Sequence, residues 1–167
     1  MNFEKYPFEK LNELLKDIVP NEKYELSVLT IGEPKFETPQ FIQDKLKETS
    51  SLLRKYPSTI GEPFLRESMI NFVKNRFNVS LKMSQIIPTF GTREVLFNFP
   101  QFALFDKKNP VIAFTNPFYQ IYEGAAIASR AEVIHINLTK ENNFKANMSD
   151  EELKRCDLVI LNFPTNP

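Results

Sequence analysis

Residues 157–167 read DLVILNFPTNP, a continuous apolar run followed by a turn built from Asn and Pro. Two similar runs precede it, PVIAF at 110–114 and EVIHI at 132–136. Short, mainly apolar runs are typical of buried parallel strands. The segments between these runs have apolar residues at helical spacing. Predicted helices and strands therefore alternate from residue 63 onward. This alternation predicts α/β layering around a mostly parallel sheet.

The helices expected in this region carry local start signals. Pro63 suits the first position of a long helix whose apolar residues recur at helical spacing. Residues 91–105 predict another helix, with a kink or break at Pro100 because proline removes a helical hydrogen bond. Ser149 and Glu152 form the pattern S-x-x-E, a capping box that predicts a short helix after it.

Residues 1–55 lack this rhythm, and we assign them to a smaller accessory domain. Helical spacing predicts a helix over 8–18, and alternation predicts a strand over 24–29. A second helix is expected to start at Pro39. Further on, residues 85–90 are interpreted as the end of a strand that leads into the helix at 91.

Composition excludes several classes of protein. The chain has 167 residues, of which 42% are apolar and 25% charged, as in ordinary globular domains. Lys+Arg and Asp+Glu are both 21, which predicts neither a nucleic acid nor a membrane surface as partner. No apolar run approaches the roughly 20 residues of a membrane span. One cysteine fits a reducing cytoplasm, and one histidine makes a histidine-based metal site implausible.

The turn at Gly91, Thr92 and Arg93 is a candidate anion site. Free N–H groups at a helix start, together with the helix dipole, favour a bound phosphate. The Thr92 hydroxyl and the Arg93 cation could add to such a site. The alternative is that Gly-Thr is a plain helix entry without any ligand, and the residues alone do not decide between the two.

Two further loops follow apolar strands, at the sheet edge where α/β proteins bind ligands. Tyr119 offers a ring that can stack on a planar ligand, whereas Phe118 and Tyr122 are interpreted as core residues. Asn162 and Asn166 carry amides that can donate to a ligand oxygen. Taken alone, an Asn before Pro is better explained as a turn former.

The order of these segments resembles the class I/II aminotransferases, pyridoxal-phosphate enzymes of fold type I. LTIGEPKFETP resembles the family's L-x-x-G-E-P-D-F-x-T-P, and KYPSTIGEPFLRE resembles K-Y-x-x-x-x-G-x-x-x-L-R-E. GTREVLF resembles the phosphate-loop segment, NPFYQIY resembles P-x-Y-x-x-Y, and NFPTNP resembles the start of N-x-P-x-N-P-T-G. The resemblance implies a three-layer α/β/α large domain with a mixed, mostly parallel sheet. Residues 1–55 would be an N-terminal arm and part of a small domain, and 56–167 the first part of the large domain.

The resemblance also implies roles for particular residues around pyridoxal 5'-phosphate. The N–H groups of Thr92 and Arg93, following Gly91, would hold the phosphate. Tyr119 would stack on the pyridine ring, and Asn166 would hydrogen-bond the phenolic oxygen of that ring.

Three further positions would serve the substrate and a second subunit. Ile31 and Gly32 would bind substrate, with the Gly32 backbone approaching the α-carboxylate. Tyr56 would reach the cofactor phosphate of the partner subunit, so a cytoplasmic homodimer is expected.

The resemblance assigns no catalytic residue to this chain. The family's Schiff-base lysine, the Asp at the pyridine nitrogen and the substrate-clamping Arg lie downstream of the matched segments, so we expect the front part of a longer enzyme. The implied reaction moves an amino group between an amino acid and a 2-oxo acid. PTFGTREVLFNFPQF resembles the branch that acts on N-succinyldiaminopimelate with 2-oxoglutarate, on the route to lysine. A related C–S β-lyase and a non-catalytic fragment remain open alternatives.

Overall fold

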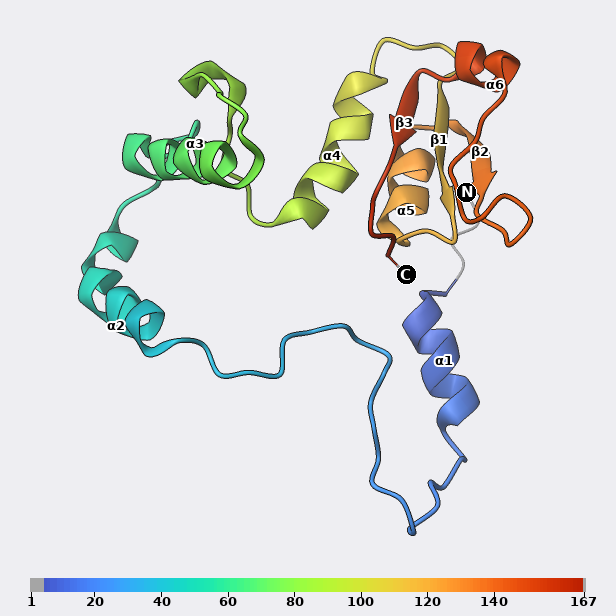
Figure 1. Cartoon of the computed structure of the whole chain (residues 1–167), viewed down its shortest axis with the longest axis horizontal. Helices are drawn as coiled ribbons and strands as arrows, with labels where there is room; N and C mark the ends of the chain where they lie inside the picture. The colour runs from blue at the N-terminus through green and yellow to red at the C-terminus, as the bar shows by residue number, and fades with distance from the viewer. Residues whose placement is uncertain (1–4, 167) are drawn as a thin grey trace. The chain divides into compact units, whose positions relative to one another are not determined.

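The computed structural model describes residues 5–166 of the chain. The chain divides between Lys55 and Tyr56 into two compact units. The first unit contains three helical segments, coloured blue to cyan in Figure 1, and the second contains the sheet. Within residues 5–166, no helix is long and apolar enough to cross a membrane.

The first unit consists of α1 (Pro7–Leu15), α2 (Gln40–Thr49) and the 3-10 helix η1 (Ser50–Arg54). The predicted helices at 8–18 and after Pro39 are confirmed, although α1 ends at Leu15. The predicted strand at 24–29 is wrong, because these residues run as irregular chain between α1 and α2 (Figure 1). Alternating side chains fit a strand, but a strand also needs a neighbour for its main-chain hydrogen bonds.

The second unit is built on a parallel sheet with the strand order β2-β1-β3. Its strands are β1 (Val111–Asn116), β2 (Glu132–Asn137) and β3 (Leu158–Ile160). The register places Phe114 of β1 opposite His135 on one side and Ile160 on the other. The predicted parallel sheet is confirmed, and β3 is shorter than the apolar run 157–163 suggested.

The helices of this unit largely begin at the positions that the sequence predicted. They are α3 (Pro63–Phe77), α4 (Thr92–Ala103), α5 (Ile121–Ala128) and α6 (Asp150–Arg155), with the 3-10 helix η2 at Met83–Gln85. The buried Pro100 lies inside α4, so the helix is not broken there and ends three residues later. Ser149 and Glu152 form both halves of the predicted capping box, with the Ser149 N–H donating to Glu152 Oε2 at 2.8 Å.

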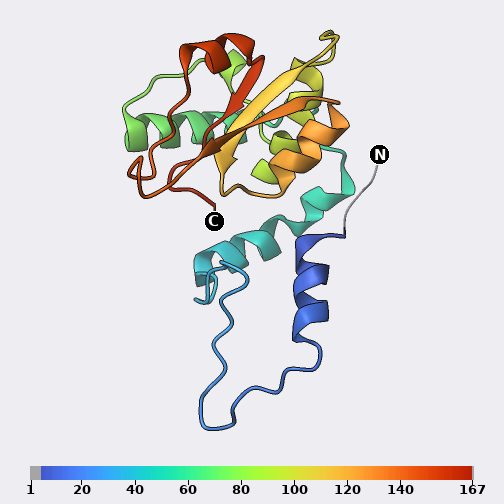
Figure 2. The same ribbon diagram turned by 90° about the vertical axis from the view of Figure 1, so that its right-hand side faces the viewer.

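The core of the unit lies between β1 and the two helices α4 and α5 (Figures 1 and 2). Ile112 and Phe114 of β1 pack with Tyr122 and Ala126 of α5, and Leu96 of α4 borders this cluster. Residues 111–115 are all buried, so both faces of β1 are covered, as expected of a central parallel strand.

The predicted strand end at 85–90 is wrong. The chain there passes through η2 and continues as irregular structure up to α4. Pro88 has no N–H to donate to a neighbouring strand, which disfavours pairing in the middle of this stretch.

Candidate cofactor site at the carboxyl edge of the sheet

The loops that follow the three parallel strands leave the sheet at the same edge. They enclose a cavity of about 500 Å³. Its lining comes from all three loops: Pro117, Leu138, Phe144, Phe163, Pro164 and Thr165. Ligands of open α/β sheets bind at this edge. The predicted site residues do not line this cavity themselves, but Asn166 follows its last lining residue.

Helix α4 is oriented with its first residue toward this carboxyl edge. Its last turn lies beside the opposite edge, since Gln101 and Leu104 line a common cavity with Pro110, which precedes β1. The helix therefore runs antiparallel to the strands. Its free N–H groups and the positive end of its dipole point toward the edge where ligands bind.

Gly91 forms the turn at the start of α4. It has φ 85° and is the N-cap residue of the helix, and no side chain caps the helix there. A Cβ at this position would meet no atom within 4 Å, so the glycine is needed for its positive φ and leaves open space beside the helix start. Thr92 and Arg93 follow in the first turn, and both are exposed. The structure thus places the three predicted phosphate-binding residues together at an open helix start.

Glu94 brings a negative charge to the same turn. Its Oε2 atom accepts a hydrogen bond from the Phe90 N–H at 2.8 Å, one residue ahead of the N-cap. The carboxylate therefore satisfies the Phe90 amide and leaves the amides of Thr92 and Arg93 for a ligand. Because Glu94 opposes a bound anion, the adjacent Arg93 cation is needed to offset its charge.

Tyr119 lies in the loop between β1 and α5 with its ring half buried. The ring stands at 82° to that of Tyr122, with centroids 5.9 Å apart, and borders the core cluster. Tyr122 is 2% exposed, and Phe118 also packs against the core, so the interpretation of both as core residues is confirmed. The buried Tyr122 ring therefore fixes one edge of the Tyr119 ring.

Asn162 anchors the loop after β3 to this aromatic group. Burial raises the pKa of the Tyr122 phenol, and the hydrogen bond from Asn162 partly opposes that rise. At the same edge, Asn116 Nδ2 donates to Asn137 Oδ1 at 2.8 Å and joins the ends of β1 and β2. The Asn162 side chain therefore has a structural partner.

The remaining predicted residues, Asn166, Tyr56, Ile31 and Gly32, are exposed. Asn166 is the last described residue, and Pro167, the second half of the predicted turn, lies outside the described residues. Tyr56 is fully exposed at the start of the second unit. Ile31 and Gly32 lie on exposed irregular chain in the first unit.

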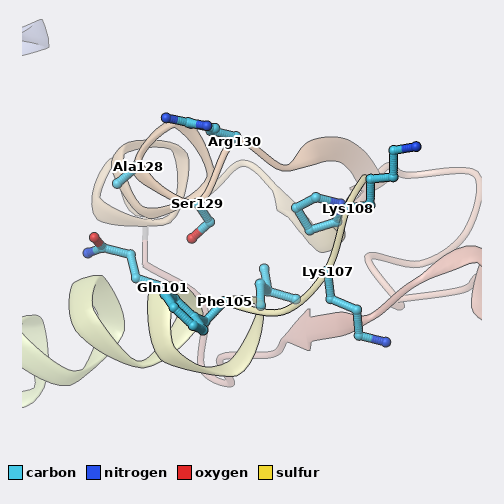
Figure 3. A pocket seen from close by; sticks show the side chains of 9 residues that line it. Gln101, Phe105, Lys107, Lys108, Ala128, Ser129 and Arg130 are labelled. Carbon is cyan, nitrogen blue, oxygen red and sulfur yellow. The ribbon is translucent and has the colours of Figure 1, made fainter.

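A second cavity, of about 380 Å³, lies at the opposite edge of the sheet. Figure 3 shows the Ser129 hydroxyl pointing into it, whereas the charged ends of Lys107, Lys108 and Arg130 point outward in different directions. Lys107 is engaged elsewhere, because its Nζ lies 2.9 Å from Asp157 Oδ1. The three cations therefore do not converge on one ligand position.

Comparisons with known proteins agree with this geometry. A family model described as aminotransferase class I and II matches residues 25–167. Aminotransferase AspB from Helicobacter pylori is 53% identical, with a TM-score of 0.94 over 100% of this chain and 44% of that structure. An aminotransferase from Neisseria meningitidis is 38% identical, with a TM-score of 0.81 over 93% of this chain and 41% of that structure. LL-diaminopimelate aminotransferase of Maridesulfovibrio salexigens is 27% identical over 97% of this chain and 42% of that relative.

The fold and its open helix start define an α/β unit of fold type I, as carried by pyridoxal-phosphate enzymes. The chain belongs to the aminotransferase class I and II family. It spans about two fifths of the length of the relatives that it matches. The family depends on pyridoxal phosphate, so the predicted cofactor is confirmed at the family level.

Gly91, Thr92, Arg93 and Tyr119 each fit this cofactor by their chemistry. The Gly91 turn leaves room for a phosphate beside exposed N–H groups, and the half-buried Tyr119 ring offers an aromatic face on a fixed support.

Sequence reasoning missed the importance of Arg66 as a single residue. In the sequence, Arg66 is only one residue of the LRE segment of a longer motif, whereas the structure buries it to 9% exposure. An arginine on a helix that is otherwise mostly exposed gives no signal of burial, because the partners that bury it lie far along the chain.

Proposed function

We propose that the polypeptide containing this chain is a pyridoxal-phosphate-dependent aminotransferase that moves an amino group from an amino acid to a 2-oxo acid. One observation carries the proposal, the open start of α4 at the carboxyl edge of the sheet in a chain of this family. When bound, pyridoxal phosphate withdraws electrons from the amino-acid carbon and so makes amino transfer possible. The chain supplies binding and orientation for that chemistry.

Each predicted residue has a distinct task in this proposal. The N–H groups of Thr92 and Arg93 bind the phosphate dianion, and the Arg93 cation offsets Glu94. Tyr119 orients the cofactor ring by stacking, with Tyr122 as its support. Asn166 donates to the phenolic oxygen of the ring.

Substrate and partner contacts complete the site in the proposal. Ile31 and the Gly32 backbone face the substrate carboxylate, and Tyr56 serves the phosphate of the partner subunit in a homodimer. The exposure of Tyr56 and the absence of a Cβ at Gly32 are compatible with these tasks.

The substrate that we favour is a diaminopimelate-type amino acid with 2-oxoglutarate as acceptor. Two observations support this choice: the sequence resemblance to the succinyldiaminopimelate branch, and relatives named LL-diaminopimelate aminotransferase at 27% to 32% identity. Such a substrate places the enzyme on the route to lysine and cell-wall precursors. Aspartate is the main competitor, since a relative from Rickettsia felis at 30% identity is named probable aspartate/prephenate aminotransferase.

Purified full-length polypeptide, loaded with pyridoxal phosphate, tests the proposal. We expect glutamate to form from 2-oxoglutarate when LL-diaminopimelate, N-succinyl-LL-diaminopimelate or aspartate is the donor, and their rates rank the substrates. Release of pyruvate and ammonia from cystathionine, without need of an oxo acid, would instead identify a C–S lyase. A polypeptide that takes up no pyridoxal phosphate would contradict both readings.

A further inference from the structure

Arg66 is a buried charged residue on α3 for which the proposed chemistry has no use. It is 9% exposed. In the described part of the chain its guanidinium donates to two main-chain carbonyl oxygens, those of Met83 and Ile86, the latter at 3.3 Å from Nε. Removing a charge from water is unfavourable unless hydrogen bonds compensate it. The two carbonyls provide that compensation and hold the residues after α3 against the helix.

The chain reverses direction to make these contacts possible. Helix α3 ends at Phe77, and its C-cap residue Asn78 adopts a left-handed conformation with φ 55°. The chain then folds back beside α3 through η2, as Figure 1 shows. The guanidinium has a planar fork of donors in fixed geometry, so bonds to Met83 and Ile86 fix the position of this segment. A lysine ammonium has no such fork.

A second contact fixes the next part of the same segment. Gly61, in the turn before α3, has φ 84°, and a Cβ there would lie 2.4 Å from Pro88 Cγ. The Pro88 ring therefore packs directly on the Gly61 backbone. Residues 83–88 are held at three points, and only Thr89 and Phe90 separate them from the Gly91 turn. The Thr89 hydroxyl continues the connection by donating to the Gly91 carbonyl at 3.3 Å.

From these contacts we propose that Arg66 is a positioning residue for the phosphate corner, which we define as Gly91–Arg93. It acts through residues 83–90 and touches neither cofactor nor substrate. Because the proposal rests on the proposed function, its test must separate an effect on phosphate binding from a loss of cofactor binding in general.

The full-length apo polypeptide provides this separation when it is titrated with two probes, pyridoxal phosphate and pyridoxal without phosphate. We expect Arg66→Lys to weaken affinity for pyridoxal phosphate about tenfold, since it loses charged hydrogen bonds that fix the corner. Affinity for pyridoxal should stay within about twofold of wild type, because that probe makes no use of the corner. The measured signature is the fall in the ratio of the two affinities.

Arg76→Lys is the matched control, since Arg76 is an exposed residue on the same helix and lies over the Phe77 ring. It should leave both affinities unchanged. If Arg66→Lys does not fold, Pro88→Ala loosens the same segment at its contact with Gly61 and should lower the ratio about threefold. An unchanged ratio, or a parallel fall for both probes, overturns the role of Arg66. If the wild type binds neither probe, the proposed function itself fails.

Discussion

The proposed stacking role of Tyr119 requires its ring but not its hydroxyl, so the two can be tested separately. Its ring borders the core and meets Tyr122 edge-on, and stacking uses only its face. We expect Tyr119→Phe in the full-length polypeptide to keep its affinity for pyridoxal phosphate within about twofold, and Tyr119→Ala to lose about tenfold. Equilibrium titration of the apo polypeptide measures both. Tyr24→Ala, at an exposed position of the first unit, is the control, and equal losses for the Phe and Ala variants would contradict stacking.

Asp157 is a residue whose charge supports the sheet directly. Its Oδ2 accepts from the Val111 N–H at 3.0 Å, its own N–H donates to the Val111 carbonyl at 2.9 Å, and Lys107 pairs with Oδ1. The side chain of Asp157 is 21% exposed. The hydrogen bond from Lys107, with that from Val111, lowers the pKa of the Asp157 carboxyl below its usual 3.8. Ionised Asp157 therefore joins the starts of β1 and β3.

This lowered pKa determines how stability depends on pH. The unfolded chain takes up the proton at higher pH than the folded one, so the stabilisation is complete well above 3.8 and is lost as pH falls through the folded pKa. We expect Asp157→Asn to lower the urea midpoint of the full-length polypeptide at pH 7, with a smaller difference from wild type at pH 3. Equal differences at both pH values would show that the charge does not contribute.

Two secondary-structure elements carry a serine at one end, and the two serines differ in their hydrogen bonds. Ser149 caps α6, with Oγ accepting from the Glu152 N–H at 3.2 Å, whereas Ser129 follows α5 with a buried Oγ that has no hydrogen-bond partner among the described residues. We expect Ser149→Ala to reduce the free energy of unfolding by about 1 kcal/mol. Ser129→Ala should be neutral or slightly stabilising, because it removes an unsatisfied hydroxyl. Chemical denaturation of the full-length polypeptide compares them, and a larger loss for Ser129→Ala would contradict this assignment.

Elements with a local cause could be predicted from the sequence, and elements that depend on a distant partner could not. The run at 110–114 is apolar throughout, and only a central strand buries both faces of such a run. Pro63 and the capping box at Ser149 likewise mark helix starts by local chemistry. The run at 24–29 has the alternation of a strand, but its state depends on whether another strand lies beside it. The 85–90 stretch contains Pro88, which lacks an N–H and therefore locally disfavours a strand.

The residues of the candidate site also differ in whether local sequence or a distant partner determines their position. Gly91–Arg93 could be placed at a helix start and Tyr119 in the loop after a strand, because local sequence signals mark these positions. Their roles in cofactor binding stay predictions. The anchoring of Asn162 to Tyr122 could not be foreseen, since it joins residues about 40 positions apart in sequence. Tyr56, Ile31 and Gly32 remain predictions, because their proposed partners are a second subunit and a substrate.

At the scale of the whole molecule, the amount of exposed apolar surface favours an extensive interface. Large side chains such as Phe36, Phe90 and Phe105 are 89% to 93% exposed. Extended apolar surface of this kind is unusual for a monomer and marks surfaces that other protein covers. The relatives are more than twice as long as this chain, so the remainder of a longer polypeptide and a second subunit are both available to cover it. The exposed apolar surface is compatible with the proposed homodimer.

Subunit mixing tests the dimer and its shared site together. Tyr56→Phe removes the hydroxyl proposed to reach the partner's phosphate, and Thr92→Pro removes one corner N–H at a helix position that suits proline. Each variant alone should remain dimeric and retain little pyridoxal phosphate after gel filtration. In a mixed dimer one site carries both defects and the other carries neither. Random reassembly of equal amounts should therefore restore cofactor to about one quarter of the sites. Retention no higher than the mean of the two separate variants would show that Tyr56 serves its own subunit or no cofactor at all.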